Sequence, residues 1–215
     1  MFDNNIDICI EVASPLEETE CAMYLIAELL KKNKIDMNLK IVYDYKCEEM
    51  GFYINQNYMR STIFVNPSRC KQKGELVEGT NKEHGYPGYV TDQSVFGVTI
   101  HEFCHLLQFE IFDDILSQFA KEFPTQRLYL NDYSNNEVYD ELAEIMSLYI
   151  TNPFLLKTIS KPHWKFCKKF FKSPVACSCK RAYDIYHAFP ISVKEQLKNK
   201  WGITYNEYDE KFVRV

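Results

Sequence analysis

Two histidines and a glutamate near the middle of the chain have the residue types and the spacing of a metal-dependent hydrolase. They form the segment HEFCH, in which His101 and His105 are four residues apart and Glu102 follows the first histidine. Residues four apart share one face of a helix, so both imidazoles can reach one tetrahedral zinc ion. Glu102 is turned by about 100° from His101, where it can act on a water at the metal without being a ligand. The segment therefore predicts a zinc site with Glu102 as its general base.

The neighbouring residues favour the helix that this chemistry requires. Thr91 and Asp92 can cap its start, and the pattern predicts that it extends to about Phe112. The alternative is an ordinary helix with two hydrogen-bonded histidines, because HExxH arises by chance in on the order of one such chain in a hundred. Apolar residues that can bury the opposite face favour the metal site: Phe96, Ile100, Phe103, Leu106 and Leu107.

A zinc site of this type needs a third protein ligand, usually a carboxylate, and the segment Asn136–Tyr149 is the best source. Its apolar residues recur at helical spacing and predict a second helix there. Two pairs of acids are spaced four apart, so that one member of a pair can bind the metal while the other supports the site. Periodicity alone leaves both pairs open: Asp140 with Glu144, and Glu137 with Glu141.

These segments together resemble the zincin superfamily and, within it, the catalytic domain of anthrax lethal factor and related small bacterial and phage metallopeptidases. HEFCH looks like the HEFGH of that family. The segment Tyr133–Glu144 is similar to a family segment that reads Tyr, six residues, a ligand acid, two residues and Ala-Glu. Residues 149–153 and 161–171 look like the closing helix pair of the family, so the resemblance covers about Phe96 to Phe171.

The resemblance implies a role for each matching residue. Tyr133 would stabilise the oxyanion, Asp140 would be the third zinc ligand and Glu144 would support the site from behind the ligands. The family usually has Glu where this chain has Asp140, which is one methylene shorter, so the helix must approach the metal by about 1.5 Å more. If the helix is instead shifted in register, Glu141 is the ligand, and Glu137 is the next candidate.

The residues and the resemblance predict a zinc metallopeptidase that hydrolyses peptide bonds. Zinc held by His101, His105 and Asp140 would lower the pKa of a bound water. Glu102 would take the proton of that water and pass it to the leaving amine, while zinc and Tyr133 would stabilise the oxyanion. Glu102 and Tyr133 serve chemistry and not metal affinity, and their presence favours an active enzyme.

Two other functions remain candidates. One is a catalytically silent protein of the zincin fold with a structural or binding role, for example in a virion or a toxin complex. The other is a zinc amidohydrolase that acts on a non-peptide amide. A long open groove would favour peptides, and a small closed pocket would favour the amidohydrolase. The strand Ser61–Val65 is either a sheet edge along which a peptide can lie or an ordinary core strand.

The order of the expected elements predicts an α+β fold of the zincin type. We expect one domain over residues 1–215, with a small mixed sheet and one backing helix (Glu17–Asn33) in residues 1–90, and the active-site helix and a mostly helical half in residues 91–215. The helical half should be broken near Ser173-Pro174 and Pro190, and Cys70–Val90 should be a long loop. Strands are expected over Ile6–Val12, Met37–Tyr45, Gly51–Asn55 and Arg60–Val65.

The composition and charge of the chain limit the kinds of molecule that it is expected to bind. The net charge is −5 and the basic residues are dispersed, which disfavours nucleic acid, and no apolar stretch is long enough to cross a membrane. We therefore expect a peptide or protein substrate. The first 14 residues lack the features of a signal peptide, which predicts a cytoplasmic protein with eight reduced cysteines, although delivery into another cell or a virion is compatible. Four further residues do not have zinc-finger spacing: His163, Cys167, Cys177 and Cys179.

Overall fold

A four-stranded mixed sheet forms the base of the molecule. Its strand order is β1-β2-β4-β3, with β1, β2 and β4 parallel and β3 antiparallel to β4. The strands are β1 (Asp7–Ile10), β2 (Asn38–Tyr43), β3 (Gly51–Asn57) and β4 (Arg60–Val65). The computed structural model describes residues 7–10, 16–57, 60–71, 75–77, 82–84, 92–125, 128, 130, 137–171, 187 and 191–215.

The helix α1 (Glu17–Asn33) covers this sheet and has the bounds that its periodicity predicts. Acids in its first turn and lysines in its last turn complement the helix dipole, and it ends where Lys34 turns left-handed at a φ of 56°. Its buried face and the alternating buried residues of β2 and β4 belong to one hydrophobic core, to which each fully buried aliphatic side chain contributes about 1.5–3 kcal/mol. The buried aliphatic residues include Leu25, Ile26, Leu29 and Leu30 of α1, Leu39 and Ile41 of β2, and Ile63 and Val65 of β4.

The strand order shows that the interpretation of Ser61–Val65 as a sheet edge is wrong. β4 lies between β2 and β3, so both of its backbone edges are paired. β3 pairs only with β4 among the described residues and is therefore the outer strand on this side. The sequence predicts that both strands exist, but it does not say which of them pairs with β2.

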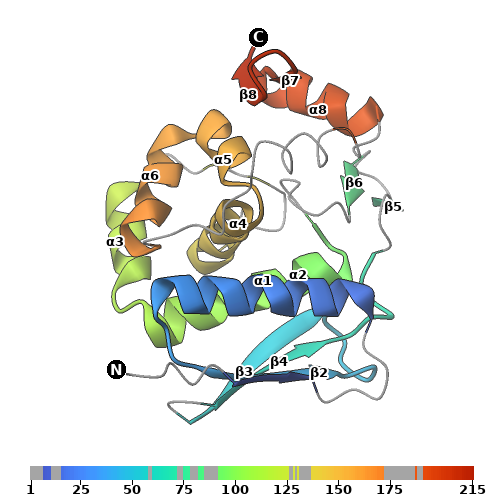
Figure 1. The fold of residues 1–215 in the computed structure, drawn as a ribbon, viewed down its shortest axis with the longest axis vertical. Helices are drawn as coiled ribbons and strands as arrows, with labels where there is room; N and C mark the ends of the chain where they lie inside the picture. Colours follow the sequence, from blue (N-terminus) through green and yellow to red (C-terminus); the bar gives the residue numbers. More distant parts are fainter. Residues whose placement is uncertain are drawn as a thin grey trace.

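The helix α2 (Val95–Leu106), which carries HEFCH, lies beside α1 above the sheet, as Figure 1 shows. It contacts β3 and β4 below it and the helix α4 (Val138–Thr151) on its other side. Every residue of α2 except His101 is buried. It is therefore a central helix enclosed on several sides, whereas the sequence predicts a helix with one buried face.

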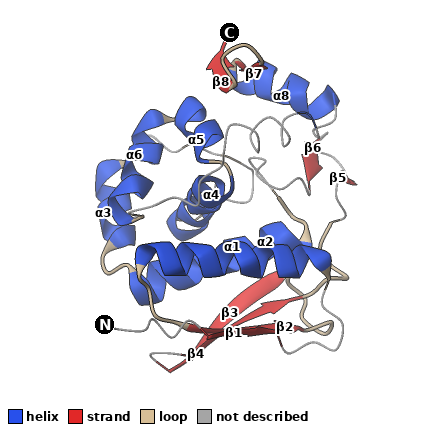
Figure 2. Ribbon diagram, viewed as in Figure 1, coloured by secondary structure: helices blue, strands red, loops and turns tan. Residues whose placement is uncertain are grey.

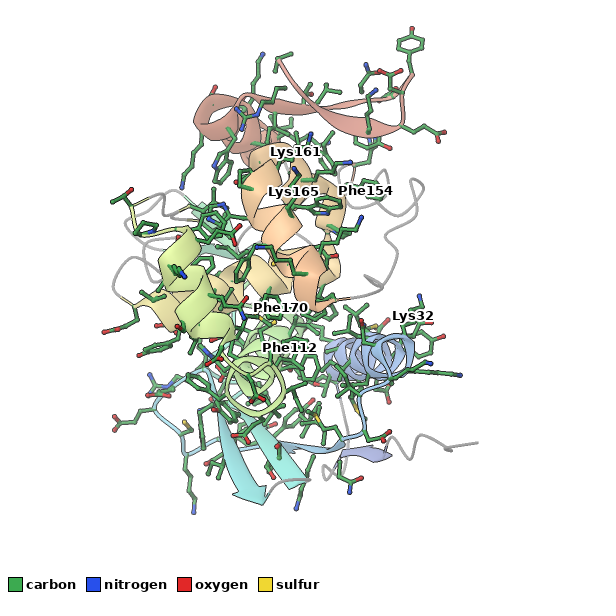
Figure 3. The ribbon with its side chains drawn as sticks, turned by 90° about the vertical axis from the view of Figure 1, so that its left-hand side faces the viewer. Lys32, Phe112, Phe154, Lys161, Lys165 and Phe170 are labelled. Atoms are coloured by element: carbon green, nitrogen blue, oxygen red, sulfur yellow. The ribbon has the colours of Figure 1, made fainter. Side chains whose placement is uncertain are left out.

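The helices after α2 form a second layer above α1 and α2 (Figure 2). Figure 3 shows Phe112 and Phe170 side by side where the lower helices meet this layer, with ring centroids 5.6 Å apart, while Lys161 and Lys165 lie on the outer side of α6 (Lys161–Phe170). No helix in the described part of the chain is long and apolar enough to cross a membrane. Besides α4, the layer contains α3 (Ile115–Glu122), α5 (Pro153–Ile159) and α6 (Lys161–Phe170).

The C-terminal end departs from the predicted helical half. The helix α8 (Ile191–Trp201) ends at Gly202, whose φ is 61°, and a hairpin of β7 (Ile203–Asn206) and β8 (Lys211–Arg214) follows. The predicted loop Cys70–Val90 also contains a short strand pair, β5 (Glu75–Val77) and β6 (Lys82–His84). The predicted breaks at Ser173-Pro174 and at Pro190 both lie outside the described residues. The α+β class and the mixed sheet are confirmed.

Candidate metal centre

The start of α2 is fixed by a small hydrogen-bond network. The Ser94 hydroxyl accepts from the Gly97 N–H at 3.2 Å, and the Ser94 N–H and hydroxyl both donate to Asp92 Oδ1, at 2.9 and 2.6 Å. A Cβ on Gly97 would lie 2.1 Å from the Asp92 carbonyl oxygen, so only glycine allows this approach. The helix thus begins at Val95 with Ser94 as its cap, and Asp92, which the sequence predicts as a cap, instead orients Ser94.

The end of α2 changes pitch directly after the motif. The π-helix η1 (Leu107–Ile111) continues it and ends at Phe112, where the sequence predicts the end of the helix. π-helical turns often occur at functional sites because they re-aim the side chains that follow. Here Gln108 is buried, whereas Phe109 is 49% exposed with its ring centroid 6.3 Å from that of His105.

Three side chains from α2 and α4 bring donor atoms together. The Nε2 atoms of His101 and His105 are 3.0 Å apart, and Asp140 Oδ1 lies 3.3 Å from Nε2 of His105 and 3.9 Å from Nε2 of His101. In a tetrahedral site with bonds of about 2.0–2.1 Å to zinc, the donor atoms lie about 3.3 Å from one another. The triangle formed by these three donor atoms, from His101, His105 and Asp140, therefore has the size and the donor types to hold one metal ion.

The other acids of α4 have different surroundings. Glu144 Oε1 lies 3.1 Å from Nδ1 of His101, on the side of the ring away from the triangle. Glu141 is 0% exposed and accepts a hydrogen bond from the Leu128 N–H at 2.6 Å. Glu137 precedes the helix and is exposed. The structure thus brings Asp140 and Glu144 to the histidines, and Glu141 faces a different segment.

Glu102 is buried beside the triangle, and the edge strand β3 lies against it. A Cβ on Gly51 would lie 3.0 Å from Glu102 Cγ and 2.6 Å from a methyl of Val98, so glycine permits the strand to come this close. Glu102 is 9% exposed. Burial raises the pKa of its carboxyl to about 7; His101 opposes the rise, and Glu49 and the other acids nearby add to it. Such a carboxyl can both take and release a proton near neutral pH.

The two histidines have opposite electrostatic environments in the absence of a metal. Burial lowers the pKa of His101, but the hydrogen bond and charge of Glu144, with the charges of Glu102 and Asp140, outweigh it and raise the pKa to about 9. For His105, burial and the charge of His101 lower the pKa to about 3, and the nearby polar side chain of Gln108 opposes this only in part. His101 therefore titrates in the range where metal binding is measured, and His105 is neutral throughout it.

A cavity of about 350 Å³ adjoins the centre on the side of Glu102 and His101. It lies between α2 and the start of β3, and no lysine or arginine of the described residues lines it. Its carboxylates are Glu48, Glu49, Asp92, Glu102 and Glu144.

Aromatic rings surround His105 on the other side of the centre. The Tyr53 and Phe109 rings are stacked with centroids 6.1 Å apart, and the Tyr139 ring lies 5.8 Å from the His105 ring. Tyr139 is 40% exposed, and Phe109 is more exposed still. The centre therefore has an acidic side and an aromatic side.

Some of the residues to which the sequence analysis gives a role lie outside the described part of the chain. Tyr133, the expected oxyanion donor, is outside the described residues, and so are Cys177 and Cys179. His163 is a core residue whose ring stacks on Phe123 at 4.0 Å and whose Nδ1 is 2.7 Å from the Ser160 hydroxyl.

The sequence alone does not single out Gln108, although its position three residues after His105 places it on the same helix face.

Comparison of the chain with protein-family models, with curated proteins and with solved structures gives no match.

Proposed function

We propose that the protein is a zinc-dependent metallopeptidase of the zincin type, with His101, His105 and Asp140 as ligands and Glu102 as general base. The observation that carries this proposal is the triangle of donor atoms beside a buried Glu102 that is not part of it. The fold supports the proposal as well. The helix α2, which bears HEFCH, lies against β3, the outer antiparallel strand of a mixed sheet.

The donor set favours zinc. Two imidazole nitrogens and one carboxylate oxygen form the protein half of many catalytic zinc sites, which keep the fourth position open. A zinc ion held there would supply Lewis acidity and lower the pKa of water in its open position toward neutrality. Glu144 would fix the ring of His101 by accepting a hydrogen bond from its Nδ1–H, as carboxylates behind zinc-bound histidines do.

The protein's own groups account for the proton transfers. Glu102 takes a proton from the attacking water and later gives it to the leaving amine, and its burial, which raises the pKa of the carboxyl in the metal-free protein, helps it to hold the proton between the two steps. Tyr133, by the resemblance described above, donates a hydrogen bond to the oxyanion. A buried carboxyl that ligates nothing is costly, so Glu102 favours an enzyme over a catalytically silent binding protein.

The surroundings of Glu102 favour a peptide over a small amide. The outer edge of β3 is unpaired among the described residues, and an extended peptide can add to such an edge through main-chain hydrogen bonds. The adjoining cavity of about 350 Å³ can take a substrate side chain. A zinc amidohydrolase for small substrates would instead enclose its substrate in a closed pocket.

The test is cleavage of a peptide library by the zinc-loaded protein, followed by mass spectrometry. Glu102→Gln should retain stoichiometric zinc and lose at least about 100-fold in activity, because an amide cannot accept the proton. Glu195→Gln, an exposed change on α8, should leave both unchanged. Chelation should abolish cleavage, and zinc should restore it. Full activity of Glu102→Gln, or activity indifferent to chelators, would contradict the proposal.

The same preparation distinguishes the candidate ligands. Asp140→Ala should bind zinc at least about 100-fold more weakly, because it removes one of three donors. Glu141→Ala should keep zinc but lower the free energy of unfolding by about 1–3 kcal/mol, because it leaves the Leu128 N–H unpaired. If Glu141→Ala loses zinc and Asp140→Ala keeps it, the third ligand is Glu141.

A further inference from the structure

A buried amide behind the second histidine has no part in the reaction proposed above. Gln108 is 5% exposed, and its Nε2 donates to the carbonyl oxygen of Tyr139 at 3.1 Å. Its Oε1 is buried and has no hydrogen-bond partner of standard geometry within the described residues. The same holds for Nδ1 of His105, three residues earlier. Buried polar atoms are almost always paired, so two such atoms on one helix face require an explanation.

The orientation of the Gln108 amide follows from its partner. The Tyr139 carbonyl can only accept a hydrogen bond, so the NH₂ group must face it. A flipped amide would place two acceptors against each other. The Oε1 atom therefore points away from α4 and is available to a donor.

The orientation of His105 supplies that donor. Its Nε2 faces the other two donor atoms of the triangle, at 3.0 and 3.3 Å, and must present a lone pair there to bind a metal. A neutral imidazole with its lone pair on Nε2 carries its hydrogen on Nδ1. Gln108 follows His105 by three residues, so the two side chains lie on the same helix face, and Gln108 is hydrogen-bonded to Tyr139, the residue whose ring lies 5.8 Å from the His105 ring. The buried donor and the buried acceptor thus match in chemistry and in position.

We propose that Gln108 is a positioning residue that holds His105 in its metal-binding tautomer and ties it to the turn that carries Asp140. Its Oε1 accepts the Nδ1–H of His105, and its NH₂ group holds the carbonyl of Tyr139, the residue before Asp140. His101 has a charged partner in Glu144, whereas His105 has this neutral one. The inference rests on the proposed function in that it takes His105 and Asp140 as metal ligands.

The experiment compares three variants of the full chain. Gln108→Leu removes both hydrogen bonds, Gln108→Glu keeps the acceptor for His105 but loses the donor to Tyr139, and Gln118→Leu is a matched change at an exposed position of α3. Zinc affinity is measured by competition with a chelator. Gln108→Leu should weaken zinc binding about 10- to 100-fold, as loss of a group behind a zinc ligand does. Gln108→Glu should recover most of this loss, and Gln118→Leu should match the wild type.

The tautomer of His105 provides a second readout that needs no metal. Long-range ¹H–¹⁵N NMR spectra are recorded above pH 9, where His101 is neutral and no longer has to donate to Nε2 of His105. The metal-free wild-type protein should then show the hydrogen on Nδ1 of His105, and Gln108→Leu should give a mixture of tautomers. A wild-type His105 with its hydrogen on Nε2 would overturn the inference even if Gln108→Leu does not fold. Equal zinc affinities for Gln108→Leu and Gln108→Glu would also overturn it, because the acceptor would then be irrelevant.

The two proposals fail in different ways. A wild-type protein that binds no zinc, or binds it and cleaves no peptide, contradicts the proposed function, while the tautomer measurement still reports on the pairing of Gln108 with His105. Cleavage by the wild type together with unchanged zinc affinity in Gln108→Leu contradicts only the inference about Gln108.

Discussion

Asp140 and Glu141 illustrate how neighbouring residues of one type acquire separate tasks. They are adjacent on α4 and therefore point about 100° apart around the helix. Asp140 faces the histidines, and Glu141 faces the backbone of Leu128, which it anchors to the start of the helix. A carboxylate used in this way supports the fold, and a carboxylate aimed at two imidazoles is suited to a metal.

The pKa of His101 predicts how zinc affinity depends on pH. The imidazole must be neutral to bind zinc, and its pKa in the metal-free protein is about 9. Protons therefore compete with zinc below this pH, and the apparent Kd should weaken by about tenfold for each pH unit between 9 and 6. His105 adds no further dependence there, because its pKa is about 3. Competition titrations with a chelator across this range measure the slope.

Glu144→Gln is the matching variant for this prediction. Removal of the charge that most strongly raises the pKa of His101 should shift the onset of the slope to lower pH. A Kd that is constant from pH 6 to 9 in the wild type would contradict the assignment of a protonated His101.

At the residue scale the sequence predicts most of the candidate site, because helical spacing alone places His101, Glu102 and His105 on a common surface. The choice between Asp140 and Glu141 came from a resemblance and not from periodicity, since two adjacent acids both fit a polar helix face. Gln108 could not be ranked from the sequence, because its importance depends on the Tyr139 carbonyl of another helix.

The contact between α2 and β3 is the element-scale feature on which the site depends. Gly51→Ala would place a methyl group 2.6 Å from Val98 and 3.0 Å from Glu102. The strand must then move away, which should lower the free energy of unfolding by about 1–3 kcal/mol. Displacement of Glu102 should also lower kcat/KM by about 10- to 100-fold, with zinc content unchanged. Chemical denaturation, peptide cleavage and metal analysis measure the three quantities.

Gly202→Ala is the control for this strand variant. Gly202 has a φ of 61° at the far end of α8, so alanine there should cost about 1–3 kcal/mol through backbone strain alone. Its activity at a temperature where both variants are folded should equal that of the wild type. Equal loss of activity in both variants would mean that stability, and not the position of Glu102, explains the effect.

The elements themselves are predictable from the sequence to different degrees. The bounds of α1 and of β4 agree with the periodicity, because long amphipathic and alternating segments carry strong signals. The order of β3 and β4 in the sheet depends on pairing between distant segments, which no local pattern contains. The hairpin of β7 and β8 went unpredicted because each strand has only four residues, too few for alternation to stand out.

For the whole molecule, charge is distributed unevenly around the centre. The cavity beside Glu102 is lined by carboxylates, whereas lysines gather on α6, on the outer side of the helical layer (Figure 3). Clefts lined by charge of one sign attract substrates of the opposite sign. The centre should therefore favour peptides that carry lysine or arginine close to the cleaved bond.

Matched peptides with basic or acidic residues test this expectation. At low salt, the basic peptide should have a kcat/KM about tenfold higher, and the difference should shrink at 0.5 M salt because screening shortens the range of the field. The double variant Glu48→Gln and Glu49→Gln should reduce the preference, whereas Glu195→Gln with Glu207→Gln, two exposed changes in the C-terminal segment, should not. Equal rates for the two peptides at low salt would contradict this reading of the cavity.

The π-helical turn η1 also has a consequence for how the chain can vary. A π-turn accommodates one residue more than an α-turn, so deletion of a single codon within Leu107–Ile111 could restore ordinary helical pitch. Five residues at about 4.4 per turn and four residues at about 3.6 per turn cover nearly the same rotation, so the residues after the deletion would keep their direction relative to HEFCH and Phe112 would still face Phe170. The same deletion within Val95–Leu106 would instead rotate everything after it by about 100° and separate the proposed ligands from the helical layer. The π-turn is therefore the place where this helix can lose one residue without a change of phase.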